Sequence, residues 1–427
     1  MRHAASWRAR RLVRWGFIAF VATVPFDMFP LFGETFALTK LTGLLFLLLA
    51  LVQPKLTLRR PPAAFWWFCA YLLVAVAAAV PILETGYAAG AVGRLTTTAQ
   101  MIVMFWIVSN VMRDEELAWK GLVAFYVACV LIAVLMAVGI GRTVIMTPRG
   151  ERLSFGGGNA NAVGSALTLG LFIILAGSLA SRFTDRKWKV LLPITGTVLL
   201  YGMVVTGSRG AVLGSAAGLL ALGLHGERLR SRLRNLLIVL VAGSLVGYGV
   251  HTVFISRARL EEAVFGKRLS GREQIYPQAM KMFAERPILG WGPEGNTREL
   301  ARRVPFMRED SLDTHNLFLY VLTECGIVGF LPFVAGFILC VGSARRAVRS
   351  RHGLLPVVLV FAVLAMGLAS NWIRRKPLWL VLGYAVAAGA SAGPRRRRAR
   401  VPSEFARLVS APEKRLEAGA GAPVSRG

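Results

Sequence analysis

The sequence predicts an all-α, polytopic integral membrane protein with about twelve transmembrane helices and one long external loop that contains short helices. Three observations support this fold class. The 427 residues are 55% hydrophobic, with a mean hydropathy of +0.56, and only 17% are charged. The apolar residues form blocks of about twenty, the length that a helix needs to cross the hydrocarbon core. Short basic clusters separate these blocks.

The apolar blocks are predicted to be helices because an irregular chain cannot cross lipid with unpaired backbone groups. The blocks are rich in Leu, Ala and Val and lack the alternation of barrel strands. Hydropathy and the basic clusters place the helices at residues 13–31, 36–53, 63–83, 91–111, 118–140, 159–181, 189–206, 209–225, 235–255, 315–342, 353–371 and 377–393.

One transmembrane domain is expected over residues 1–393, with both termini in the cytoplasm. The first helix is expected to be retained, because no small-residue cleavage site precedes Asp27. Residues 256–314 form the long external loop, and residues 141–158 form a second one. Residues 394–427 are rich in Arg, Ala and Pro, and are expected to be a disordered cytoplasmic tail near anionic lipids.

The net charge of +29 is explained by topology. Most basic clusters fall in alternate loops, as the positive-inside rule requires, and no motif for nucleic-acid binding accompanies them. The four cysteines, none in a CxxC pair, are expected to be small core residues. Membrane lipids, and no nucleic acid, are therefore the expected surroundings.

Arg209 lies in Thr206-Gly-Ser-Arg-Gly210, a polar stretch between two apolar runs at the external boundary. An ionisable residue there indicates function, and a guanidinium can bind phosphate oxygens while it stays charged. An anchor at the lipid headgroups explains the position equally well.

Arg272 begins a stretch with helical spacing that is expected to end at Glu285-Arg-Pro287. Residues 288–296, which include Trp291, are rich in Gly and Pro and predict a tight non-helical loop. Its glycines would let backbone amides approach a sugar or phosphate, although simple turn formation is the commoner explanation.

His315 follows Asp313 where the long loop returns to the membrane. Histidine takes a proton from a hydroxyl near neutral pH, and a carboxylate can orient its ring. Alternatively, Asp313 or Thr314 caps the next helix and His315 is merely interfacial. Glu309, Asp310 and Asp313 are close enough in the sequence to hold a hard cation, but acids at a helix start are more often solvated. No metal or cofactor is expected.

In order along the chain, these pieces resemble the bacterial O-antigen ligase and O-antigen polymerase family of membrane glycosyltransferases. The motifs that carry the resemblance are Gly156-Gly-Gly-Asn-Ala-Asn161, Thr206-Gly-Ser-Arg-Gly210, Gly271-Arg272, Pro287-Ile-Leu-Gly-Trp-Gly292, Thr314-His-Asn-Leu-Phe-Leu319 and Glu324-Cys-Gly-Ile-Val-Gly329. The sequence departs from many relatives at Tyr276, where they carry tryptophan.

The resemblance implies transfer of a glycan from polyprenyl pyrophosphate to an acceptor hydroxyl at the periplasmic face of the bacterial inner membrane. It assigns Arg209 and Arg272 to the pyrophosphate and His315 to the general base. Within the motifs and beside them, the side chains expected to contact substrate are Asn159, Asn161, Ser208, Trp291, Asp313 and Asn316. Direct displacement with inversion needs no metal, because pyrophosphate is already an activated leaving group.

The lipid A core is the first choice of acceptor, as for a ligase. A polymerase would use a second lipid-linked glycan, and a further variant would use a protein hydroxyl. A transporter is the main alternative of another class, but it predicts ionisable residues near the bilayer midplane, and the predicted spans are nearly uncharged there. A non-enzymatic scaffold would leave the arginines and His315 without a purpose.

Overall fold

The computed structural model describes most of the chain. It covers residues 2–27, 38–147, 150–180, 185–224, 229–253, 257–258, 261, 271–305 and 310–392. The predicted tail at residues 394–427 lies outside this part of the chain, as does most of residues 256–270 in the long loop.

Within the described residues, a helix occupies each of the twelve predicted segments. These helices are α1 (Arg2–Thr23), α2 (Leu38–Val52), α4 (Ala63–Leu83), α5 (Ala88–Val111), α6 (Glu115–Val138), α7 (Ala160–Leu179), α8 (Arg186–Val205), α9 (Arg209–Gly223), α10 (Leu229–Thr252), α14 (Leu317–Ala347), α15 (Leu355–Ala369) and α16 (Lys376–Ser391). Seven of the described helices are long and apolar enough to cross a membrane, and α2, α9 and α15 are shorter apolar helices. The all-α membrane fold is therefore confirmed.

Shorter elements connect these helices. They are η1 (Val24–Phe26), α3 (Pro54–Thr57), β1 (Arg142–Thr147), β2 (Gly150–Phe155), α12 (Arg272–Glu285) and α13 (Gly295–Arg303). Helix α12 ends where the sequence predicts. The sequence did not predict α13, which begins inside the stretch expected to be non-helical.

Residues 141–158, which the sequence predicts to be a loop, contain a β-hairpin. Its strands pair antiparallel, with Arg142 opposite Phe155 and Thr147 opposite Gly150. Side chains along β1 alternate between exposed and half-buried, which suits its β-branched residues Thr143, Val144 and Ile145. The pairing directs alternate side chains of β2 inward, so the hairpin delivers specific residues to the helices.

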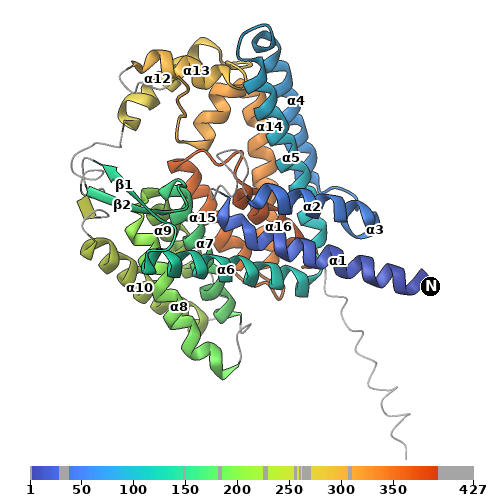
Figure 1. Cartoon of the computed structure of the whole chain (residues 1–427), viewed down its shortest axis with the longest axis vertical. Helices are drawn as coiled ribbons and strands as arrows, with labels where there is room; N and C mark the ends of the chain where they lie inside the picture. Colours follow the sequence, from blue (N-terminus) through green and yellow to red (C-terminus); the bar gives the residue numbers. More distant parts are fainter. Residues whose placement is uncertain are drawn as a thin grey trace, which may run out of the picture.

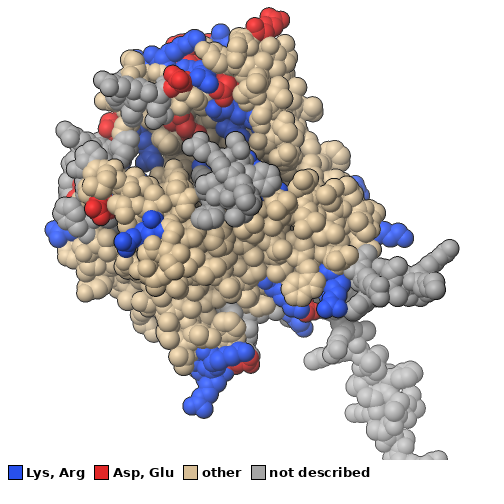
Figure 2. Space-filling model, in the orientation of Figure 1, with Lys and Arg blue, Asp and Glu red and all other residues tan. Residues whose placement is uncertain are grey.

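The helices share one hydrophobic core. Phe68 of α4 lies at its centre, with ring centroids 5.0 Å from Trp379 of α16 and 5.4 Å from Phe105 of α5. Figure 1 shows α12 and α13 beside the upper part of α4, the hairpin beside α9, and α1 and α3 on the opposite side from the hairpin. In Figure 2 the surface is hollowed between the α12–α13 region and the helices below it, with basic side chains inside the hollow.

A break in α14 holds the Gly-rich loop against the membrane helices. Gly326 is non-helical (φ 58°, ψ −163°), so nearby carbonyls turn toward the loop. The Thr323 carbonyl accepts from the Trp291 N–H (2.9 Å), and the Glu324 carbonyl accepts from the Gly292 N–H (2.9 Å). Two motifs that are distant in the sequence thus meet through backbone hydrogen bonds.

We expect Gly326→Ala to loosen this contact. The new β-carbon would lie 2.2 Å from the Ile288 carbonyl oxygen, in a backbone conformation that L side chains rarely adopt. The free energy of unfolding should fall by about 2 kcal/mol or more, measured as a lower melting temperature in detergent. Gly243→Ala in α10 is the control, because a β-carbon there meets nothing within 4 Å. Equal melting temperatures for the two variants would contradict this role.

Candidate functional site

Arg209 is the first residue of α9. Ser208 caps that helix by accepting from the Ala211 N–H (3.2 Å), and the Ser208 side chain is buried. A helix N-terminus carries partial positive charge from its unpaired N–H groups. A cation placed there is electrostatically unfavourable until an anion binds, so the start of α9 is suited to a phosphate group.

The hairpin adds Arg152, a residue that the motifs in the sequence did not single out. Its Nε donates to the Thr206 carbonyl (2.8 Å), and its Nη2 donates to Oδ1 of Asn161 (2.8 Å). Arg152 is only 9% exposed. Burial and the neighbouring Arg209 charge lower the pKa of Arg152 to about 10. The site therefore holds two like charges close together, which favours binding of an anion.

Arg272 is the first residue of α12. Its Nη2 donates to the carbonyl of Ala369 (2.6 Å), the last residue of α15. A β-carbon placed on Gly210, next to Arg209, would lie 3.4 Å from the Ala369 β-carbon. The end of α15 thus lies between the two helix starts that carry Arg209 and Arg272. These arginines are sixty-three positions apart in the sequence, and the Arg272 side chain and the backbone beside Arg209 both lie against Ala369.

The backbone of His315 is in the left-handed region, at φ +52°. The Asp313 carboxylate stabilises this conformation, because Oδ1 accepts from the His315 N–H (2.7 Å). Oδ2 accepts from Nδ2 of Asn371 (2.9 Å), two residues beyond Ala369. The sequence suggested that a carboxylate can orient the His315 ring, and the structure shows the Asp313 carboxylate accepting from the His315 backbone. It fixes the loop to residues 368–371.

Tyr276 lies between Arg272 and the loop that carries His315. Its hydroxyl donates to the Leu368 carbonyl (3.4 Å). Burial raises the pKa of Tyr276, and the Arg272 charge and a hydrogen bond with the Asn316 side chain oppose this rise. The departure from the family pattern therefore lies at the junction between Arg272 and the His315 loop.

Three of the side chains that were expected to contact substrate also act as N-caps of helices. Asn159 starts α7 by accepting from the Asn161 N–H (2.8 Å), and Ser208 starts α9. Asn316 starts α14 by accepting from the Phe318 and Leu319 N–H groups, so the cap is Asn316 rather than Asp313 or Thr314. These contacts satisfy N–H groups at three helix starts, and direct contact of these side chains with substrate stays a prediction.

Asn159 and Asn161 also line a small cavity beside the site. Asp27, Ser370, Trp372 and Arg375 contribute to the same cavity. Burial lowers the pKa of Arg375, although the charges of Asp27 and Asp313 oppose this.

Trp291, by contrast, packs within the loop region. Its Nε1 donates to the Met282 carbonyl (2.8 Å), and the Arg286 guanidinium lies 4.1 Å from its ring centroid. These contacts hold the Gly-rich loop against α12, and a substrate contact for Trp291 stays a prediction.

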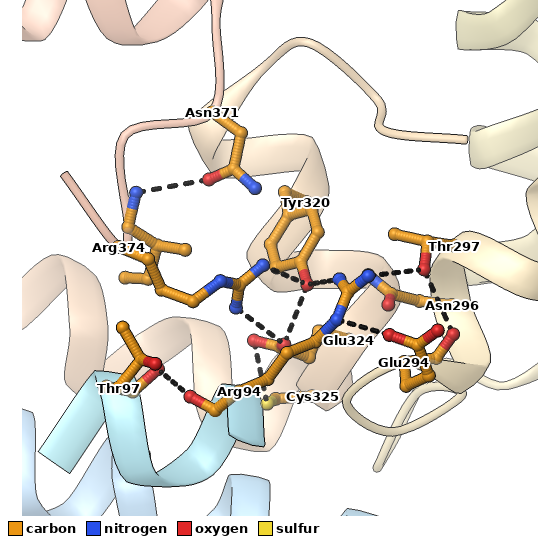
Figure 3. A network of polar contacts seen from close by, with 12 residues as sticks. Arg94, Thr97, Glu294, Asn296, Thr297, Tyr320, Glu324, Cys325, Asn371 and Arg374 are labelled. Carbon is orange, nitrogen blue, oxygen red and sulfur yellow. Dashed lines mark hydrogen bonds and ion pairs between the residues drawn. The ribbon is translucent and has the colours of Figure 1, made fainter. Parts of the chain in front are cut away.

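A buried polar network surrounds Tyr320 and Glu324 of α14 (Figure 3). The Tyr320 hydroxyl accepts from Nη1 of Arg94 (2.8 Å) and Nη2 of Arg374 (2.7 Å), and it donates to Oε1 of Glu324 (3.0 Å). Nε of Arg94 also pairs with Glu294 (2.5 Å), just before α13. The network joins α5, α13, α14 and the segment before α16. The sequence analysis missed it because its members are distant along the chain.

Both arginines of the network have a carboxylate partner, since Nη1 of Arg374 lies 3.6 Å from Oε1 of Glu324. Breaking such a buried pair typically costs about 3–5 kcal/mol. The network therefore holds its buried guanidinium groups against carboxylates of the protein.

Comparisons with known proteins agree with the resemblance seen in the sequence. Residues 194–334, which include Arg209, Arg272 and His315, match the family described as O-antigen ligase. The chain is 28% identical over 330 residues to the O-antigen ligase of Pseudomonas aeruginosa strain PAO1, and the alignment covers 76% of each protein. Both matches bear out the resemblance to the O-antigen ligase family.

The hydrogen bond between Asn371 and Asp313 is testable by exchange of the two residues. Asn371→Asp places two carboxylates face to face, and we expect the rate of glycan transfer to fall about tenfold or more as the His315 loop moves. The double variant Asn371→Asp with Asp313→Asn restores a donor and an acceptor across the contact, and it keeps an oxygen for the His315 N–H. Its rate should recover substantially. Equal loss in the single and double variants would contradict this positioning role.

The environment of Arg152 predicts a pH effect. In Arg152→Lys, burial and the Arg209 charge should lower the lysine pKa as they lower that of Arg152. A lysine begins from a lower pKa than an arginine, so it loses its proton at a lower pH. Transfer by the variant should therefore fall as pH rises through the alkaline range, at pH values where the original protein keeps its rate. The control is Arg142→Lys, at an exposed position on β1. Parallel pH profiles for all three proteins would refute the effect.

Proposed function

We propose that this chain, whose sequence is similar to the O-antigen ligases, transfers a glycan from polyprenyl pyrophosphate to an acceptor hydroxyl at the periplasmic face of the bacterial inner membrane. One observation carries the proposal. Residues 368–371 contact the Arg272 side chain, the position beside Arg209 and the Asp313 carboxylate that fixes His315. Pyrophosphate-binding cations and a candidate base therefore surround one segment.

In the proposed reaction, the acceptor oxygen attacks the anomeric carbon of the donor. The hydroxyl proton passes to the His315 ring as the new carbon–oxygen bond forms. The bond between the anomeric carbon and the phosphate oxygen breaks, and polyprenyl pyrophosphate leaves with the bonding electrons. Attack from the side opposite the leaving group inverts the anomeric configuration.

Arg209 and Arg272 act on the leaving group. Negative charge grows on the pyrophosphate as the bond breaks, and guanidinium groups stabilise it through paired hydrogen bonds. The α9 N-terminus and the Arg152 charge contribute to the same positive field. The activated leaving group makes a metal ion unnecessary in this proposal, so transfer should persist in the presence of a chelator.

The proposed orientation follows the basic clusters of the sequence. It places the loops with Arg182–Lys189 and Arg345–Arg351 in the cytoplasm together with both termini, and α12, α13 and the hairpin in the periplasm. The donor's polyprenyl chain would remain in the bilayer while its pyrophosphate reaches Arg209 at the membrane boundary. The acceptor is proposed to be the lipid A core.

Substitutions at the three central residues test the mechanism. We expect Arg209→Gln and Arg272→Gln each to lower the transfer rate by about 10²–10³, because each removes one charge-stabilising contact. His315→Ala should lower the rate by about 10²–10⁴ through loss of the base. The assay uses purified protein with a labelled polyprenyl-pyrophosphate glycan.

Arg142→Gln, at an exposed position on β1, is the matched control and should keep its rate. Full transfer by the His315→Ala protein would remove His315 as the base.

The acceptor is tested by offering the same labelled donor with either lipid A core or a second lipid-linked glycan. A glycan joined to lipid A core in the β configuration from an α-linked donor, or the reverse, is the expected product. Product formed only with the second lipid-linked glycan would instead identify a polymerase. A retained anomeric configuration would overturn direct displacement.

A further inference from the structure

A second large recess lies away from the candidate site, between α1, α3 and the start of α6. This α1–α3–α6 groove has a volume of about 820 Å³ and is open to the surroundings. Helices α1 and α3 lie on the opposite side of the molecule from the hairpin (Figure 1). In the orientation proposed above, the groove opens at the cytoplasmic boundary of the membrane.

The groove is strongly basic. Six cations from three elements line it, against two acids. The cations are Arg10, Arg11, Arg14, Lys55, Arg59 and Lys120.

Both acids of the lining already have basic partners. Asp114 pairs with Arg14 and caps α6 by accepting from the Leu117 N–H (3.1 Å). Glu116 pairs with Nζ of Lys120 (2.5 Å) one helical turn away. An excess of positive charge therefore remains, contributed from α1 and from both ends of α3. Burial and the nearby Arg59 charge lower the pKa of Arg113.

One wall of the groove is apolar. Trp15 and Ile18 lie on α1, and Leu56 lies on α3. Trp15 is 60% exposed, a position that suits an indole ring at the boundary between headgroups and acyl chains. A basic pocket next to an apolar wall matches a ligand that has a phosphate at one end and hydrocarbon at the other.

We propose that the α1–α3–α6 groove binds the headgroup of an anionic glycerophospholipid, with the acyl chains against Trp15, Ile18 and Leu56. Basic pockets between helices on the cytoplasmic side of membrane proteins bind such headgroups. The site is separate from the glycan-transfer site and goes beyond the proposed function. Its occupancy would fix α1 relative to α6, since both helices supply charged residues to the groove.

The test is native mass spectrometry of the purified full chain, titrated with phosphatidylglycerol or with phosphatidylcholine of identical acyl chains. We expect phosphatidylglycerol to bind about tenfold or more tightly than phosphatidylcholine. The triple variant Arg10→Gln, Lys55→Gln, Arg59→Gln should lose about tenfold or more of its phosphatidylglycerol affinity. Inorganic phosphate should not displace the lipid, because it lacks the chains that contact the apolar wall.

The control removes three charges from another basic cluster at the end of α14 and just beyond it, with Arg345→Gln, Arg349→Gln and Arg351→Gln. It should keep its phosphatidylglycerol affinity. If the triple variant fails to fold, the single variant Lys55→Gln tests the site. Its phosphatidylglycerol affinity should fall about three- to fivefold. Equal affinity for the two lipids, equal losses in the groove and control variants, or displacement by inorganic phosphate would each overturn the proposal.

Discussion

The candidate site depends on the end of α15. The Ala369 carbonyl accepts from Arg272, the Leu368 carbonyl accepts from Tyr276, and the Asn371 side chain donates to Asp313. These contacts come from residues near both ends of the segment 271–314, and they attach it to the end of α15. They add to the hydrogen bonds that hold Trp291 and Gly292 against α14.

The contacts also organise the charge of the site. Arg272 lies at the C-terminal end of α15, where the partial negative charge of the helix stabilises a cation. Arg209 lies at the N-terminus of α9, beside Arg152, where the surrounding charge is positive. The Arg152 charge and the start of α9 therefore make the Arg209 position favourable for an anion.

Much of the fold could be predicted from the sequence, because the length of an apolar block and the charge at its ends directly limit where a helix lies. Helices α4 and α7 begin within one residue of their predicted starts. The hairpin was missed because residues 141–158 were treated as a polar loop, although β-branched residues in β1 gave a signal. Correct use of that signal would have directed attention to Arg152.

The motifs of the site could also be found from the sequence, but not the contacts that assemble them. Asn371 is separated from Asp313 by an entire helix pair, α14 and α15, and nothing in either local sequence indicates that they meet. The same holds for Arg94 and Tyr320, which are 226 residues apart. Long-range hydrogen bonds follow from the packing of whole helices, so only the three-dimensional structure reveals them.

The most direct test of the account is an experimental structure of the full chain with a bound polyprenyl-pyrophosphate analogue. The account predicts that the pyrophosphate lies between the guanidinium groups of Arg209 and Arg272, with the anomeric position directed toward the His315 ring. A pyrophosphate bound elsewhere, with Arg209 and Arg272 in their unchanged contacts, would contradict it.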